Sequence, residues 1–144
     1  MLAYALTHPL LLGALARAGH GSKVLVADGN YPVATAVATG ARVIYLNLSP
    51  GTVEARSVIA AVLSAVPVEA AEVMSPGDGS TPPIFDSFTA LLGPDGPPLT
   101  RLSRTDFYIA ARDHDVAVVV ATGEQALFAN LLLTIGVVQT PPPQ

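Results

Sequence analysis

The chain has 144 residues, of which 51% are hydrophobic and only 12% charged, and its formal net charge is −4. Its seven Lys and Arg residues form no basic cluster, which argues against nucleic acid as a partner, and the lack of cysteine excludes disulfides and thiolate chemistry. No apolar run approaches the roughly 18 residues that a membrane span needs.

These totals indicate one domain with a buried core over residues 1–139, followed by a proline-rich tail at 140–144. Globular domains usually carry about 25% charged residues, so this surface is unusually apolar for a monomer. We therefore expect a homo-oligomer that hides apolar surface in subunit contacts. The lack of cysteine fits a reducing cytoplasm, and the apolar N-terminus lacks the basic start of a signal peptide.

The first half of the chain alternates helical and extended patterns. A helix is expected to begin after Thr7 or His8, with Pro9 in its first turn, and to end at Gly19. The continuous β-branched run at 23–27 predicts a buried strand. The elements expected next are a loop at 28–41, a strand at 42–46 and a helix at 52–66.

The second half continues this alternation. Strands are expected at 68–74, 99–102, 116–121 and 130–135, and helices at 84–92 and 103–112. Loops are expected at 75–83 and 93–98, and a loop or short helix at 123–128. Alternating strands and helices indicate a three-layer α/β/α domain, whose sheet is mainly parallel or mixed and covered on both faces.

Two titratable side chains flank the 23–27 strand. His20 stands between two glycines before it, and Asp28 follows it, at the strand end where α/β sheets commonly bind ligands. His20 is either a general acid–base or a polar loop residue, and Asp28 is either a ligand group or the start of an Asx turn. A strand rises about 3.3 Å per residue, so the two share a pocket only if one folds back or a neighbouring subunit completes the site.

Other polar side chains are candidates for the same site. Arg104 at a helix start is unfavourable for the helix dipole, which suggests another role, and Tyr108 shares its helix face or simply packs there. Asn130 opens an otherwise apolar strand, so its amide needs either a ligand hydroxyl or a backbone group. Asn30 and Tyr31 are either sugar ligands or turn residues.

No motif for a cofactor or metal is found. Gly19 and Gly21 precede a strand, whereas the glycines of a dinucleotide fingerprint follow one. Neither a Walker pattern nor a G-x-S-x-G elbow occurs. The adjacent residues Asp113, His114 and Asp115 rarely point at one ion in such a turn, so we expect neither metal nor cofactor.

In their order and spacing, several stretches resemble the RbsD/FucU family of ribose pyranases and fucose mutarotases over nearly the full chain. They are 15–21 (LARAGHG), 27–32 (ADGNYP), Phe107-Tyr108, 121–124 (ATGE) and 128–130 (FAN) through to Gly136-Val137. The setting of Arg104 is more similar to the fucose mutarotase branch, because the ribose branch tends to carry histidine there.

The resemblance implies a role for each candidate residue. His20 would be the catalytic acid–base, and Asp28 would orient it or bind a sugar hydroxyl. The implied sugar contacts are Asp28, Glu69, Arg104, Tyr108, Phe128 and Asn130. The family carries tyrosine at the position of Phe128, so this chain lacks one hydroxyl, and its fucose branch often has Asp at the position of Glu69.

The resemblance also implies an activity and an assembly. The activity is a cofactor-independent isomerase, a mutarotase or pyranase that opens and recloses the ring of a free monosaccharide, L-fucose-like or D-ribose. The family forms decamers or smaller ring- or dimer-based assemblies, with sites at subunit interfaces. Two alternatives stay open: a sugar-binding or transport-associated module without turnover, and a structural oligomer whose site has decayed.

Overall fold

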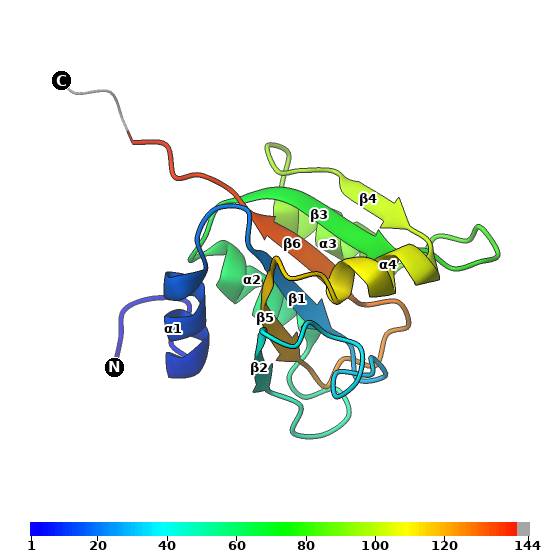
Figure 1. The fold of residues 1–144 in the computed structure, drawn as a ribbon, viewed down its shortest axis with the longest axis horizontal. Coiled ribbons are helices and arrows are strands. Elements are labelled where there is room, and N and C mark those ends of the chain that lie inside the picture. Colours follow the sequence, from blue (N-terminus) through cyan, green and yellow to red (C-terminus); the bar gives the residue numbers. More distant parts are fainter. Residues whose placement is uncertain (141–144) are drawn as a thin grey trace.

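The computed structural model describes residues 1–140, so the predicted tail lies, beyond Thr140, outside the described residues. Within them, the helices are α1 (Pro9–Ala18), α2 (Ala55–Leu63), α3 (Ile84–Leu92) and α4 (Arg104–Ala111) (Figure 1). The strands are β1 (Lys23–Ala27), β2 (Arg42–Tyr45), β3 (Val68–Met74), β4 (Leu99–Leu102), β5 (Val116–Ala121) and β6 (Leu131–Ile135). The elements follow the order expected from the sequence.

The strands form one mixed sheet in the order β2-β5-β1-β6-β3-β4. Strands β2, β5 and β1 run parallel, as do β3 and β4, whereas β6 is antiparallel to both of its neighbours. In the β6 ladders, Leu131 pairs with Val26 of β1 and Val73 of β3, so β6 begins where its neighbours end. Residues just before β6 therefore lie beside residues just after β1.

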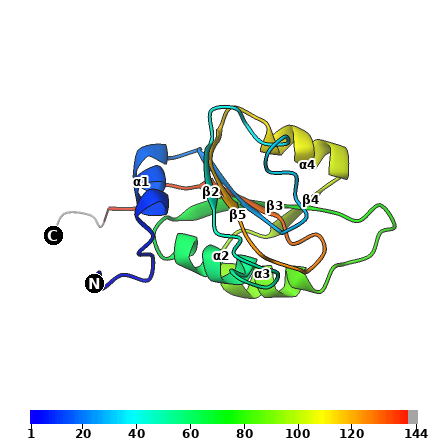
Figure 2. The same ribbon diagram turned by 90° about the horizontal axis from the view of Figure 1, so that it is seen from below.

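Helices cover both faces of the sheet, which confirms the three-layer prediction. Figure 2 shows α2 and α3 on one face and α4 on the other. Leu11 of α1, Ile59 of α2 and Phe88 of α3 belong to one buried cluster, and Phe107 of α4 packs with Tyr31 in a second. Strand β1 contributes to both clusters, which explains its uninterrupted apolar run.

Local side-chain bonds explain where two helices begin. The Nδ1 atom of His8 accepts a hydrogen bond from the Leu11 amide (3.2 Å), so His8 rather than Thr7 caps α1. Gly19 follows α1 with φ +86°, a left-handed conformation that favours glycine. Ser103 caps α4 by accepting from the Asp106 amide (3.1 Å).

Helix α2 is shorter than the region 52–66 predicted for it. Thr52 belongs instead to a turn, where its amide donates to the Ser49 carbonyl (2.8 Å) and its carbonyl accepts from the Leu48 amide (2.9 Å). The predicted helix 103–112 and the strands 42–46 and 130–135 each lose one or two terminal residues, which is the usual uncertainty at element ends. The segment 123–128 is a loop.

Candidate functional site

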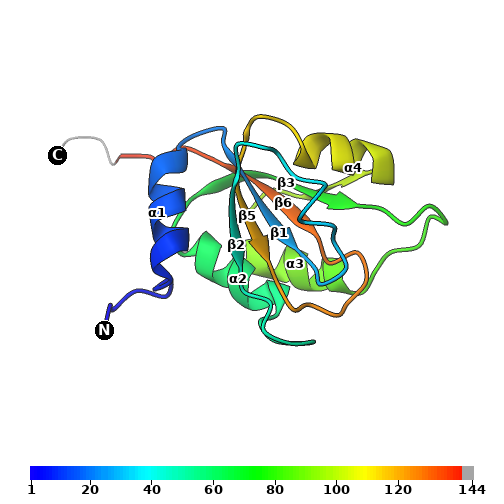
Figure 3. The ribbon, with the colours of Figure 1, turned by 60° about the horizontal axis from the view of Figure 1, so that its bottom comes forward.

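A small hollow of about 160 Å³ lies at the carboxyl end of β1. Its walls are formed by Asp28, Asn30, Tyr31, Met74, Arg104, Tyr108, Leu127, Phe128 and Asn130. Five of the six predicted sugar contacts are therefore brought together, from three separate stretches of the chain. Figure 3 shows that the segment after β1 and the segment that leads into β6 meet at this end of the sheet. There the Gly29 amide donates to the Glu124 carbonyl (2.9 Å).

The deepest polar group of this hollow is a pair formed by Asp28 and Asn130, each only 5% exposed. Asn130 accepts from the Asp28 amide through Oδ1 (2.8 Å) and donates through Nδ2 to Asp28 Oδ2 (3.0 Å). The Asn30 amide donates to Asp28 Oδ1 (3.0 Å), so Asp28 also forms the Asx turn considered as its alternative role. The side-chain amide of Asn130, for which the sequence predicted a hydrogen-bond partner, is thus bonded to Asp28.

Burial raises the pKa of Asp28 above its usual value of 3.8, against the opposing effect of the hydrogen bonds that its carboxylate accepts. Backbone amides of Asn30, Tyr31 and Ala129 and the Asn130 side chain supply those bonds. A buried carboxylate at the wall of a hollow is a strong acceptor for a ligand hydroxyl, because that contact replaces part of the lost solvation.

This shift predicts a pH-dependent stability. A carboxyl group whose pKa is higher in the folded chain binds protons more tightly when folded, so its contribution is most favourable below the unfolded value of 3.8 and is lost as pH rises through the folded value. The Asp28→Asn variant does not titrate there. The unfolding free energy of the wild type should therefore fall relative to that of Asp28→Asn as the pH rises from below 3.8 through the folded pKa of Asp28. Urea unfolding at fixed protein concentration measures this, and a pH-independent difference would contradict it.

Aromatic side chains form the wall on the α4 side. Tyr31 and Tyr108 have ring centroids 5.5 Å apart, and the Arg112 guanidinium lies 5.6 Å from the Tyr108 ring. The Tyr31 hydroxyl donates to the Ala36 carbonyl (2.8 Å), and burial raises the pKa of Tyr31. Because that hydroxyl is already bonded within the chain, Tyr108 is the better placed of the two to meet a ligand.

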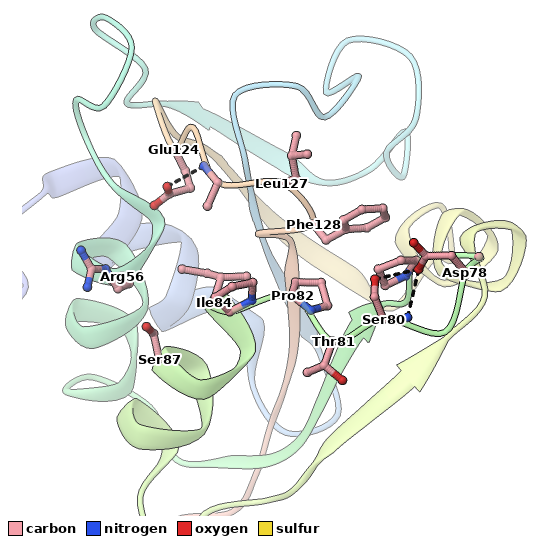
Figure 4. Close-up of a pocket in the computed structure, with 14 residues that line it drawn as sticks. Arg56, Asp78, Ser80, Thr81, Pro82, Ile84, Ser87, Glu124, Leu127 and Phe128 are labelled. Carbon is pink, nitrogen blue, oxygen red and sulfur yellow. Dashed lines mark hydrogen bonds between the residues drawn. The ribbon is translucent and has the colours of Figure 1, made fainter.

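Sequence reasoning missed the apolar wall of Met74 and Leu127, because neither residue carries a polar signal. Phe128 between them has φ +60°, a left-handed conformation that is rare for a bulky side chain and that often marks functional segments. Leu127 and Phe128 also line a larger hollow of about 900 Å³. Figure 4 shows this larger hollow, in which the Phe128 side chain extends toward the turn that holds Asp78 and Ser80.

His20 and Glu69 lie elsewhere, at the opposite end of β1. The His20 Nε2 atom is 3.1 Å from both carboxylate oxygens of Glu69, and the two side chains are 56% and 48% exposed. Residues 23–27 separate them from Asp28 by roughly 17 Å of extended strand. Within one chain, the predicted acid–base and the hollow around Asp28 therefore do not share a pocket.

Exposed apolar side chains follow β6 near Glu69. Gly136 follows β6 beside Glu69, where an added Cβ atom would lie 3.4 Å from the Glu69 Cβ atom. The next residues, Val137 and Val138, are 54% and 74% exposed. This half of the predicted site thus stands beside exposed apolar side chains.

Within residues 1–140, no group of three His, Asp or Glu side chains is arranged to hold a metal ion. In the 113–115 turn, His114 pairs with Asp113, whereas Asp115 pairs with Lys23 of β1 (3.5 Å). None of the helices described in residues 1–140 has the length and apolar content to cross a membrane.

Comparison with known proteins gives one consistent family. Residues 1–138 match the RbsD / FucU transport protein family. The chain is 33% identical to the fucose mutarotase of Homo sapiens over 150 residues, which cover 96% of this chain and 94% of that protein.

Two solved structures with similar folds come from the same family. The fucose mutarotase from Streptococcus pneumoniae, solved in complex with L-fucose, has a TM-score of 0.79 and 28% identity over 92% of this chain and 94% of its own. Bacillus subtilis RbsD complexed with D-ribose has a TM-score of 0.81 and 25% identity over 96% of this chain and 100% of its own. The chain belongs to the RbsD / FucU transport protein family, as its motifs predicted.

Proposed function

We propose that this protein is a cofactor-independent isomerase that interconverts the anomers or ring forms of a free monosaccharide, with L-fucose as its best substrate and D-ribose as the runner-up. The observation that carries the proposal is the hollow at Asp28. It combines a buried carboxylate and amide with aromatic and aliphatic walls, which is the mixture that a sugar ring requires. The mutarotases named above are similar to this chain over more than nine-tenths of its length.

The apolar wall supports a 6-deoxy sugar. Met74, Leu127 and Phe128 add apolar surface to a hollow that Asp28 and Arg104 also line. L-Fucose carries a methyl group at C6 that such a wall can bury, and D-ribose has no equivalent group. One buried methyl group contributes about 0.8 kcal/mol, which favours fucose about fourfold.

The reaction needs two proton transfers. The anomeric hydroxyl loses a proton while the ring oxygen gains one, the bond between C1 and the ring oxygen breaks, and the open aldehyde recloses on its other face. His20 is the proposed acid–base because imidazole titrates near neutrality, and Glu69 holds its ring through Nε2. Asp28, positioned by Asn130, accepts from a sugar hydroxyl, and Arg104 and Tyr108 bind further hydroxyls.

Because His20 and Asp28 lie at opposite ends of β1, we propose that each working site uses His20 from one copy and Asp28 from another. Exposed apolar side chains flank both halves: Val137 beside the His20–Glu69 pair and Leu127 (67% exposed) at the hollow. Covering both would bring the halves together and remove apolar surface from water. A homo-oligomer in the cytoplasm, a decamer or a smaller ring- or dimer-based assembly, fits these requirements.

The direct test is NMR saturation exchange between the anomers of L-fucose and of D-ribose. The wild type should accelerate exchange over buffer for at least one of them, with fucose faster. No acceleration of either sugar, with a calorimetric heat of binding, would select the alternative, a sugar-binding module without turnover. That alternative draws support from Phe128, which lacks the hydroxyl of the family tyrosine.

Restoring that hydroxyl should improve binding. The Phe128→Tyr variant should lower the half-saturating fucose concentration about 2- to 10-fold, because one added hydrogen bond contributes about 0.5–1.5 kcal/mol. Saturation exchange at varied sugar concentration measures this, and Tyr108→Phe should shift the value in the opposite direction. An unchanged half-saturation would mean that the ring at position 128 does not meet a sugar hydroxyl.

A further inference from the structure

A second hollow, of about 460 Å³, adjoins the candidate site where β1, β2 and β5 end. These three strands are parallel, and the carboxyl end of parallel strands is the usual place for ligands in α/β sheets. Most side chains around this hollow are polar: Asn30, Asn47, Ser49, Thr122, Glu124 and Gln125. None of the roles assigned so far uses Asn47 or Gln125.

The frame of this hollow is fixed by backbone contacts. The Gly29 amide donates to the Glu124 carbonyl (2.9 Å), and the Gly51 amide donates to the Gly123 carbonyl (2.7 Å). A Cβ atom on Gly123 would collide with backbone of the 49–52 turn, so that turn lies directly on Gly123. The loops that follow β1, β2 and β5 are thus joined by backbone contacts. Because the hollow is formed before a ligand arrives, less conformational entropy is lost on binding.

Three side-chain amides in this hollow are suited to binding the hydroxyl groups of a polyol. Within residues 1–140, the side-chain amides of Asn30, Asn47 and Gln125 make no hydrogen bond to another group of the chain, although the backbone amides of Asn30 and Gln125 do. Each offers a donor and an acceptor, as a sugar hydroxyl does, and none carries charge. The one carboxylate, that of Glu124, already accepts from the backbone amides of Ala55, Gln125 and Ala126. A neutral polyhydroxylated ligand therefore suits this hollow better than an ion.

The two hollows are neighbours that share lining residues. Asn30 lines both, and a third hollow of about 270 Å³ is lined by Asp28 of the first and Asn47 of the second. We propose that the hollow at Asn47 and Gln125 is a second carbohydrate subsite, so that the protein binds and interconverts reducing disaccharides. The unit with the free anomeric centre occupies the Asp28 hollow, and its glycosyl substituent occupies the second one. This inference rests on the proposed isomerase activity.

The test compares monosaccharide and disaccharide in the same saturation-exchange assay. The probes are L-fucose or D-ribose, whichever the wild type turns over, and disaccharides with that sugar at the reducing end and a hexose joined at each of its other hydroxyls in turn. At least one disaccharide should reach half-saturation at about 5-fold lower concentration than the monosaccharide, through one or two added hydrogen bonds. Asn47→Ala and Gln125→Ala should remove that gain and leave monosaccharide exchange unchanged.

Gln139→Ala is the matched control, because Gln139 is an exposed amide beyond β6. The subsite is refuted if every disaccharide binds no better than the monosaccharide, or if the gain survives in Asn47→Ala and Gln125→Ala. Monosaccharide exchange in the wild type separates the two claims. If it is accelerated, a failure with disaccharides refutes the subsite alone; if it is not, the isomerase proposal fails first.

Discussion

Replacing His20 by alanine should lower the catalysed exchange of sugar anomers by about 100- to 10,000-fold, the range that a positioned acid–base usually contributes. The expected loss is large because no other imidazole lies near the predicted site: His8 caps α1, and His114 is 98% exposed in the 113–115 turn. The variant should still bind sugar, because the hollow at Asp28 contains no part of His20. Saturation exchange gives the rate, and calorimetry gives the affinity.

His114→Ala is the matched control and should keep the wild-type rate. Glu69→Gln should fall between the two, since an amide can still hydrogen-bond to the His20 ring but makes a weaker bond than a carboxylate does. If the Glu69→Gln variant binds sugar more weakly but keeps the wild-type maximal rate, then Glu69 contacts sugar directly and does not orient His20. A wild-type rate in His20→Ala would end the assignment of His20 as the acid–base.

The second large effect is complementation between two inactive variants. Chains of His20→Ala and of Asp28→Asn should each be inactive, and their mixture, unfolded and refolded together, should regain activity. If one copy supplies His20 and another supplies Asp28, random assembly gives about one quarter of the sites both native residues. The recovered rate should thus approach one quarter of the wild-type rate, an increase from almost none.

The control is the same mixture combined without unfolding, which should stay inactive while subunits do not exchange. A refolded mixture without activity would mean that His20 and Asp28 act within one chain. That outcome would require the α1–β1 loop to move by most of the length of β1, which the hydrogen bond from the Gly21 amide to the Ile135 carbonyl (2.9 Å) opposes.

The fold was largely predictable because its elements carry local signals. The apolar run 116–121 and the turn residues around it gave the limits of β5 as they are observed, and Gly19 marked the end of α1. The start of helix α2 was predicted too early because the turn before it is held against Gly123, about 70 residues away in the chain, through bonds to Gly51 and Val53. Such a contact leaves no periodic pattern in the sequence.

The candidate site was predictable in its residues and not in its pairings. Arg104 and Asn130 each place a polar group at an unfavourable or apolar position, and Asp28 follows a buried strand, where α/β sheets commonly bind ligands. Their partners could not be assigned, since the bond between Asp28 and Asn130 spans 102 residues and the one between His20 and Glu69 spans 49. Met74 and Leu127 gave no signal, because an apolar residue in a hollow has the same composition as one in the core.

Strand β6 sets the spacing between the two halves of the site. Asn130, just before it, holds Asp28, and Gly136, just after it, lies against Glu69. A single inserted or deleted residue between them would reverse the faces of its side chains and break one of these contacts. Differences in length among relatives should therefore be excluded from 130–136 and collect in the loops at 75–83 and 93–98, which an alignment of many sequences can check.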